Sequence, residues 1–325
     1  MTELREIETN GIRLRVAEAG PASGEVVLLL HGWPESWYSW RHQIPALAEA
    51  GYHVLAPDMR GFGGSDAPTS VEAYAIQEIV GDVTGLLDAL GAERGTVIGH
   101  DWGSLVAWQT ALLAEDRVRA VGGLSVPYVG RGPRSPLEGW RAQFGENFFY
   151  ILYFQQEGVA EAEFDADPLG ILLRLYASTS DATTGSPAGD PPITDPRMSA
   201  GGMIGRIAEP KALPGWLSEE DLDYYVAEFT RAGFRGGINY YRNFHRNWET
   251  TPELATKPVA QPALFLAGAQ DVVVSWFPSN LDGLMRRAVP DLRSFTLIDG
   301  SGHWVQQERP AEVNAALLAF LGGLD

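Results

Sequence analysis

Residue 101 is an aspartate that stands between Gly99 and Gly103, three residues after the end of the apolar run 96–98. This frame, with two glycines flanking a nucleophile at a distance of two residues, holds the central side chain on a strained strand-to-helix turn. The glycines are needed because a Cβ would clash in so tight a turn. A carboxylate at the centre suits attack on saturated carbon, which gives an ordinary ester. Asp101 therefore predicts either epoxide opening or the displacement of halide from alkyl carbon.

Two further polar residues follow apolar runs in the order that such a nucleophile needs. Asp271 comes after the run 263–267, and His303 comes after the run 294–298. An acid followed by a histidine is the chain order that accompanies a nucleophile on this kind of turn. We expect His303 to act as a general base that Asp271 orients, so that together they hydrolyse an ester formed on Asp101.

The five other histidines fit this chemistry less well. His31 is expected to orient the loop that follows its strand, and His100 to point away from the site that Asp101 faces. His42 and His53 fall at the start of a helix and of a strand, and His245 falls on a helix. None of them has a partner at metal-ligand spacing backed by carboxylates, so we expect no metal site.

The motif His31-Gly32-Trp33-Pro34 follows the apolar run 26–30. Backbone N–H groups at such a position can stabilise a developing oxyanion. The candidate donors are the N–H groups of Trp33 and of Trp102, the residue after the nucleophile. Pro34 fixes the turn and removes one competing donor.

These residues require a sheet that brings the ends of several strands together. Short apolar runs alternate with helical patterns such as 74–90 and 103–114, which predicts a parallel sheet covered on both faces. An Asn10-Gly11 turn predicts a hairpin between strands at 5–9 and 13–18. The remaining predicted strands are 26–30, 53–56, 96–98, 118–124, 263–267 and 294–298.

The alternation stops near residue 128 and resumes near residue 262. The stretch between is rich in aromatic residues and has a helical pattern, so we expect a core formed by 1–127 and 261–325 and an inserted helical cap over 128–260. Ligands bind at the carboxyl ends of the strands in open α/β sheets, which is where the cap would lie. The segment 178–205, rich in Gly, Pro, Ser, Thr and Asp, is predicted to be a long mobile loop.

The composition limits the possible partners. The 325 residues, 45% of them hydrophobic, can bury a sizeable core. A net charge of −18 argues against nucleic acid or an anionic membrane as a partner. The absence of cysteine excludes disulfides and thiolate chemistry. We expect a cytoplasmic protein, because the charged N-terminus lacks the apolar segment of a signal peptide and no run approaches the length of a membrane span.

Several motifs together resemble the α/β-hydrolase-fold epoxide hydrolases of the soluble and bacterial kind, over nearly the full length of the chain. In the core they are His31-Gly32-Trp33-Pro34, Gly99-His100-Asp101-Trp102-Gly103 and Gly302-His303-Trp304. In the cap they are YILYFQ at 150–155 and NYYRN at 239–243. The resemblance implies an α/β fold with a mostly parallel eight-stranded sheet flanked by helices, an inserted cap and no cofactor.

The resemblance also implies that Tyr150 and Tyr241 activate the epoxide. The leaving alkoxide needs a hydrogen bond or a proton as the ring opens, and a phenol can supply it while staying neutral at pH 7. Tyr240 stands where a tryptophan is expected, which leaves open which tyrosine of the adjacent pair faces the site. The residues expected to line the substrate pocket are His31, Trp33, Pro34, Trp102, Tyr153, Phe154 and Trp304.

The expected reaction converts an epoxide and water into a vicinal diol, with an apolar substrate and a monomer or homodimer as the enzyme. A haloalkane dehalogenase with the same Asp101, His303 and Asp271 is the alternative, since the indole of Trp102 could bind halide. It would leave the two cap tyrosines without a role. A non-catalytic ligand receptor would leave all these residues unexplained. A serine esterase is disfavoured because Ser104 lies outside the glycine pair.

Overall fold

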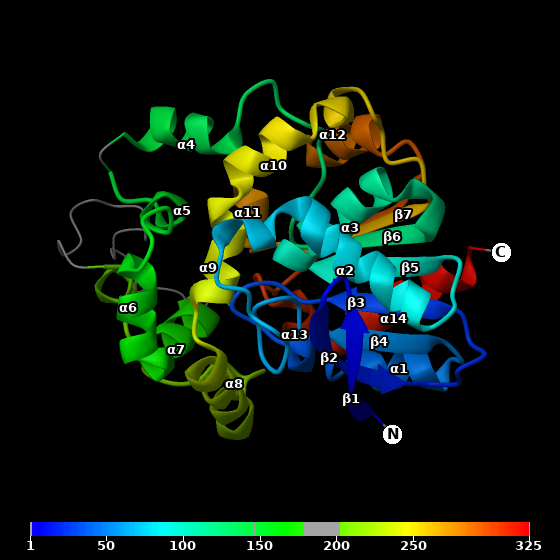
Figure 1. The fold of residues 1–325 in the computed structure, drawn as a ribbon, viewed down its shortest axis with the longest axis horizontal. Helices are drawn as coiled ribbons and strands as arrows, with labels where there is room; N and C mark the ends of the chain where they lie inside the picture. The colour runs from blue at the N-terminus through cyan, green and yellow to red at the C-terminus, as the bar shows by residue number, and fades with distance from the viewer. Residues whose placement is uncertain (1, 146, 179–201, 325) are drawn as a thin grey trace.

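The computed structural model describes residues 2–145, 147–178 and 202–324 (Figure 1). Most of the segment 178–205, predicted to be a mobile loop, therefore lies outside the described residues. One sheet of eight strands runs through the molecule in the order β1-β2-β4-β3-β5-β6-β7-β8. The strands are β1 Glu3–Thr9, β2 Ile12–Ala19, β3 Val26–Leu30, β4 His53–Pro57, β5 Gly95–His100, β6 Val118–Leu124, β7 Ala263–Gly268 and β8 Leu292–Ile298.

The sheet is parallel except at its first strands. β1 pairs with β2, and β2 with β4, in the antiparallel sense, whereas the pairs from β4 to β8 are parallel. The hairpin turn is Asn10-Gly11, and both residues have a positive φ (47° and 75°), as a tight turn between twisted strands requires. Every residue of β4, β5 and β7 is buried, which agrees with their continuous apolar character. The predicted sheet is thus confirmed.

Helices cover both faces of this sheet. Leu47 of α1 and Leu317 of α14 pack with Val27 and Leu29 on one face. On the other face, residues of α2, α3 and α12 pack in a second cluster, which continues into the aromatic residues after β6. The helices around the sheet are α1 Gln43–Glu49, α2 Ile76–Ala89, α3 Trp102–Leu113, α11 Val272–Ser275, α12 Leu281–Ala288, α13 Val305–Glu308 and α14 Pro310–Gly322, with short 3-10 turns η1 Trp37–Trp40, η2 Val71–Tyr74 and η3 Glu115–Arg117.

The helix predicted over 74–90 begins later than expected. Tyr74 ends the separate turn η2, because Ala75 adopts an extended conformation (φ −63°, ψ 152°) that interrupts the helical path. α2 then starts at Ile76. The difference moves no residue of the predicted site.

Between β6 and β7 the described residues form helices and no strand. In Figure 1 the green and olive helices α5 to α8 lie together beyond one edge of the core. The boundaries proposed for a cap, 128 and 260, remain a prediction. The elements here are α4 Pro136–Phe144, α5 Tyr150–Tyr153, α6 Val159–Ala166, α7 Pro168–Ser178, η4 Ile204–Arg206, α8 Glu219–Ala232, α9 Arg235–Arg242, α10 Phe244–Thr250 and η5 Pro252–Ala255.

Buried and half-buried polar contacts hold α8 against the core. Arg15 of β2 forms an ion pair with Glu228 of α8 and another, at 2.5 Å, with Asp58 after β4. Arg41, after η1, lies 3.1 Å from Asp221 at the start of α8. These pairs fix where α8 sits above the carboxyl ends of the strands.

Candidate active site

Asp101 occupies a strained turn between β5 and α3. Its φ is 52° and its ψ is −117°, a conformation that is costly for a residue with a side chain. A Cβ added to Gly99 would lie 2.0 Å from the carbonyl oxygen of Gly103, and one added to Gly103 would lie 2.0 Å from that of Leu30. The crowding predicted for the two glycines is therefore confirmed.

The carboxylate of Asp101 lies within the predicted oxyanion loop. The backbone N–H of Trp33 donates to Asp101 Oδ1 at 2.8 Å. The backbone N–H of Trp102 also donates to this carboxylate. Burial raises the pKa of Asp101, and the neighbouring His303 and the two N–H groups oppose that rise. Both predicted backbone donors thus contact the carboxylate of Asp101, the group on which an oxyanion would develop.

His303 lies between the two carboxylates. Its Nε2 is 3.7 Å from Asp101 Oδ2, and its Nδ1 is 3.1 Å from Asp271 Oδ1. Burial opposes the charge on the imidazole, but Asp271, Asp101 and Glu35 outweigh it and raise the pKa of His303 to about 9. Burial likewise disfavours the charge of Asp271, yet His303 and nearby hydrogen bonds bring the pKa of Asp271 below its ordinary value. The three predicted residues therefore meet, and the resting pair carries a proton on His303.

His31 holds the oxyanion loop from behind. Its Nε2 accepts a hydrogen bond from the N–H of Met59 at 2.9 Å, so its Nδ1 carries the proton and donates to the carbonyl of Gly32 at 2.8 Å. Burial lowers the pKa of His31, which keeps the ring neutral. Both ring nitrogens are thus used within the core, as the predicted orienting role requires.

A cavity of about 100 Å³ opens above Asp101. Asp101 and His303 lie in its wall with Tyr150 of α5 and Tyr241 of α9. The two tyrosine rings are 5.8 Å apart, edge to face. Burial and the charge of Asp101 raise the pKa of both phenols, so both stay protonated and able to donate.

Tyr240 does not line this cavity. Its hydroxyl donates to the carbonyl of Arg60 in the core at 3.0 Å, and its side chain is 1% exposed. Adjacent residues on a helix point about 100° apart, so the contact with Arg60 turns Tyr241 toward Asp101. The sequence left open which of these two tyrosines faces the site. In the structure Tyr241 lines the cavity and Tyr240 packs against the core.

Comparison with known proteins agrees with this arrangement. Residues 25–310 match the family described as the alpha/beta hydrolase fold. The chain is 51% identical to epoxide hydrolase A of Mycobacterium tuberculosis over 99% of this chain and 98% of that protein. The chain belongs to the epoxide hydrolases.

Solved structures give the same result for the fold. An epoxide hydrolase A from Mycobacterium thermoresistibile superposes with a TM-score of 0.92 and 52% identity, covering 100% of this chain and 99% of that chain. An epoxide hydrolase from an endophytic Streptomyces superposes with a TM-score of 0.93 and 42% identity, covering 99% and 96%. The predicted α/β-hydrolase fold is confirmed. A haloalkane dehalogenase, the alternative from the sequence, is not supported.

The cavity wall of this epoxide hydrolase differs in part from the predicted one. Trp33, Pro34 and Trp304 line it as expected. Apolar side chains not singled out from the sequence complete the wall. They lie in α7, directly before the turn η4, and in or directly after α11, and the approach of these segments to Asp101 depends on how the helices pack. They are Leu175, Met203, Val272, Val273 and Trp276.

Four residues predicted to line the cavity lie outside its wall. Two of them, Tyr153 and Phe154, belong to the segment that carries Tyr150. Tyr153 points its hydroxyl to Glu163 of α6, at 2.8 Å. Phe154 is fully buried behind the cavity, with its ring 5.2 Å from that of Trp33 and 5.0 Å from that of Tyr241. Both predictions are corrected: Tyr153 packs within the helices, and Phe154 supports residues that line the site.

The other two corrections concern the core. His31 uses both ring nitrogens in the loop beneath Asp101 and does not reach the cavity. The indole of Trp102 packs edge to face against Tyr240 and Tyr241, with ring centroids 5.5 and 5.0 Å away. Trp102 thus contributes its backbone N–H to the site, while its side chain supports the tyrosine that faces Asp101.

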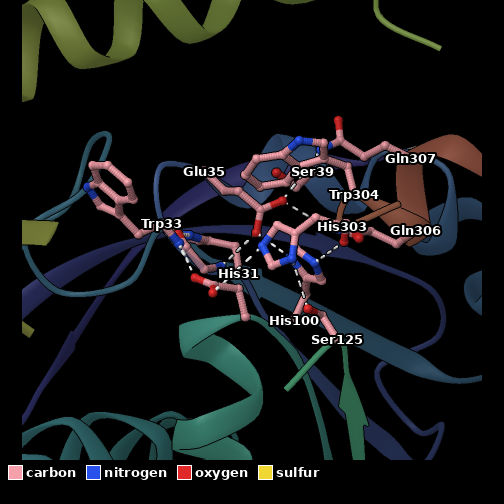
Figure 2. Close-up of polar contacts among 12 residues, drawn as sticks. His31, Trp33, Glu35, Ser39, His100, Ser125, His303, Trp304, Gln306 and Gln307 are labelled. Carbon is pink, nitrogen blue, oxygen red and sulfur yellow. Dashed lines mark hydrogen bonds and ion pairs between the residues drawn. The ribbon is translucent and has the colours of Figure 1, made fainter. Parts of the chain in front are cut away.

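Glu35 is a buried carboxylate that the sequence analysis missed. It accepts hydrogen bonds from the N–H of Gly32 at 2.8 Å and from Gln306 Nε2 at 2.9 Å, and it lies 2.7 Å from His100 Nδ1 (Figure 2). His100 Nε2 lies 2.7 Å from the carbonyl oxygen of His303, so the two ring nitrogens of His100 contact Glu35 on one side and the backbone of His303 on the other. Burial disfavours the charge of Glu35, but His100 and the other donors lower its pKa to about 2. Through these contacts Glu35 and His100 link the oxyanion loop to the loop that carries His303.

A second buried carboxylate, Glu308 of α13, holds the same loop. It accepts from the N–H of Gly302 at 2.7 Å and from the N–H of Trp304 at 2.9 Å, on either side of His303. Burial raises the pKa of Glu308 to about 7. For Glu35 the available signal was its place directly after Pro34; for Glu308 it was the spacing of five residues from His303.

The described residues contain no cluster of three or more His, Cys, Asp or Glu side chains that could hold a metal ion. Within the same residues, each helix is too short or too polar to cross a membrane.

Proposed function

We propose that this epoxide hydrolase opens its substrate through a covalent ester on Asp101 and releases a vicinal diol. The observation that carries the proposal is the position of Asp101, which faces two protonated tyrosines across one cavity. Asp101 Oδ1 is engaged by the N–H of Trp33, so Oδ2 is the oxygen available to attack. Its attack on a ring carbon forms the ester C–O bond and breaks the C–O bond of the epoxide.

Tyr150 and Tyr241 stabilise the oxygen that leaves the carbon. The opening ring develops an alkoxide, which needs a donor at the moment when the C–O bond breaks. Removing one such donor typically costs about 10²–10³ in rate at a preorganised site. The raised pKa values of both phenols keep them protonated before the reaction.

Water then hydrolyses the ester. His303, once unprotonated, takes a proton from water through Nε2, and the hydroxide formed attacks the ester carbon of Asp101. Asp271 orients His303 through Nδ1, 3.1 Å away. The N–H groups of Trp33 and Trp102 stabilise the tetrahedral oxyanion. As it collapses, its hydroxyl proton passes to the leaving ester oxygen, and the proton held by His303 replaces the one that a tyrosine gave to the opened epoxide oxygen, which leaves the free carboxylate and the diol.

The cavity favours an apolar epoxide. Apart from the reacting groups, its wall is formed by apolar side chains of the core and of the helices above it. Its volume of about 100 Å³ is well above the roughly 10–15 Å³ that one water needs. An epoxide with an apolar substituent would bury that substituent against Leu175, Met203 and Trp276.

A single turnover in ¹⁸O-labelled water tests the covalent route. The oxygen of water enters the carboxylate of Asp101 when the ester is hydrolysed, so the first diol carries no label and the peptide that contains Asp101 does. Mass spectrometry of both products reads the result. Label in the first diol would show that water attacks the epoxide directly and would overturn the proposal.

A further inference from the structure

The hydroxyl of Ser125 contacts both members of the Asp271–His303 pair, and the mechanism above does not use it. Ser125 follows β6, the strand between those that precede Asp101 and Asp271. Its Oγ donates to Asp271 Oδ2 at 2.5 Å and lies 2.9 Å from His303 Nδ1. Figure 2 shows it directly beside the histidines. Each of the three residues, Ser125, Asp271 and His303, thus contacts the other two.

The hydroxyl of Ser125 has one proton, and the group to which it donates that proton determines which ring nitrogen of His303 carries a hydrogen. Asp271 is ionised, because the charge of His303 and its hydrogen bonds lower its pKa, so the hydroxyl proton of Ser125 goes to Asp271. The lone pair of Ser125 Oγ then faces His303 Nδ1. Nδ1 must carry a proton that Ser125 and Asp271 share, and Nε2 is left to face the cavity. A base that takes a proton from water needs this tautomer.

The backbone holds Ser125 in place at a cost. Its φ is 71°, a value that glycine adopts freely and other residues do not. Its N–H donates to the carbonyl of Leu266 in β7 at 2.9 Å, and the residue is fully buried. A glycine at position 125 would be free of this backbone strain, yet the chain has a serine there. Strain of this kind is typical of residues that act at a functional site.

We propose that Ser125 is a positioning residue, whose hydroxyl keeps Asp271 ionised and holds the proton of His303 on Nδ1 so that Nε2 serves as the base. This inference rests on the proposed function, since it assigns Ser125 to the hydrolysis of the ester on Asp101. Ser125 is not expected to act in ester formation, because its Oγ contacts neither Asp101 nor the two tyrosines.

Replacing Ser125 leaves the other charged and titratable groups around His303 in place. They come from the turn between β5 and α3, the oxyanion loop, the end of β7 and α13. They are Asp101, His100, Glu35, Asp271 and Glu308. A change in the pH dependence of the Ser125 variants therefore reports the hydroxyl.

Ser125→Ala and Ser125→Gly together test the proposal. Both remove the hydroxyl, but only glycine is relaxed at the positive φ. Rapid-quench measurement of ester and diol gives the rates of ester formation and of ester hydrolysis separately. We expect unchanged ester formation in both variants and hydrolysis slower by roughly tenfold, the scale of one hydrogen bond to a charged group. The acid limb of hydrolysis should move to lower pH, because His303 Nδ1 loses an acceptor that favours its charged form.

Ser104→Ala is the matched control. Ser104 Oγ is also buried and donates to Val126, the residue after Ser125, but it touches neither Asp271 nor His303. This variant should leave both rates and the pH profile unchanged. Ser125→Gly with normal hydrolysis, or an acid limb that does not move in either Ser125 variant, would overturn the proposal and leave Ser125 as a backbone element only. Failure to trap any ester on wild-type Asp101 would instead overturn the proposed function itself.

Discussion

Asp101 and His303 maintain each other's charge in the resting site. Burial raises the pKa of Asp101, and the nearby imidazolium opposes that rise. In return, Asp101 is one of the three carboxylates that raise the pKa of His303 to about 9. Ester formation makes Asp101 neutral and removes its contribution. The pKa of His303 must therefore fall during the first half-reaction, which converts the resting imidazolium into a usable base.

The rates of ester formation and of ester hydrolysis should consequently change in different pH ranges. Ester formation should slow as the pH falls through the pKa of Asp101, which lies above its ordinary value of 3.8, because the protonated acid is no nucleophile. Ester hydrolysis should accelerate as the pH rises, with an acid limb below the value of about 9 that applies to the resting His303. Rapid-quench sampling across pH measures both. A hydrolysis limb at pH 9 or higher would show that the charge of Asp101 does not act on His303.

The adjacent tyrosines Tyr240 and Tyr241 provide a matched pair of variants. Tyr241→Phe should slow ester formation by about 100-fold, the effect of losing one donor to a developing oxyanion. Tyr240→Phe removes the buried hydrogen bond to Arg60 and should cost about 1 kcal/mol of stability with little effect on that rate. Ester-formation rates and urea unfolding of both proteins separate the two effects. Equal loss of rate in the two variants would contradict the assignment of Tyr241 to the site.

The loops that follow the strands assemble the site from five neighbouring elements. Trp33, Asp101, Ser125, Asp271 and His303 follow β3, β5, β6, β7 and β8, which are consecutive in the sheet. Strand ends were readable from the sequence, because each apolar run stops where a polar residue begins. The sequence therefore predicted four of these residues from their positions after apolar runs, and only Ser125 was not singled out.

The buried residues that hold these loops in place could not be predicted from the sequence in the same way. Glu35 and Glu308 look like ordinary loop and helix acids in the sequence, and only the packing of distant segments shows that both are buried and bonded to backbone N–H groups. The choice between Tyr240 and Tyr241 depended on which side of α9 meets the core. Tyr153 was misplaced for the same reason, since its contact with Glu163 depends on the packing of α5 against α6.

Glu308 makes the loop around His303 sensitive to pH. Its folded pKa of about 7 lies above the ordinary value of 4.5, so the folded state holds this proton more tightly than the unfolded state does. The contribution of Glu308 to stability is therefore fully present below pH 4.5 and is lost as the pH rises toward 7. Glu308→Gln cannot titrate. Between these pH values, wild type should lose stability relative to Glu308→Gln by an amount on the order of 3 kcal/mol, measured by urea unfolding at each pH. A constant difference between the two proteins would contradict the raised pKa.

At the scale of the whole molecule, the reaction needs groups from two regions of the chain. Asp101 and His303 belong to the core, whereas Tyr150 and Tyr241 come from the helices between β6 and β7. Their distance is set by contacts such as Arg15–Glu228, which join those helices to the sheet. The fold class and strand order of the core could be predicted because apolar periodicity is local. The docking of the helices could not, because it depends on contacts between residues far apart in the sequence.

The ion pair between Arg15 and Glu228 should stabilise this docking. Glu228→Gln leaves Arg15, whose side chain is 18% exposed, with Asp58 alone, and we expect a loss of about 1–2 kcal/mol, as for a half-buried charged contact. Glu209→Gln is the control, since Glu209 is 71% exposed in its pair with Arg174 and should contribute less than about 1 kcal/mol. Urea unfolding measures the stabilities, and limited proteolysis reports loosening of α8. Equal losses in both variants would show that the Arg15 contact does not fix the helix.

Trp33, Trp276 and Trp304, three of the ten tryptophans, form part of the cavity wall. Indole emission depends on nearby charge, and the wall faces the place where the charge of Asp101 disappears and returns in each cycle. The protein therefore contains its own optical reporter, with no dye or label to add. Mixing it with an epoxide should give one fluorescence change as the ester forms and a second of opposite sign as the diol leaves. A spectrometer alone could then follow each half of the reaction in the unmodified chain.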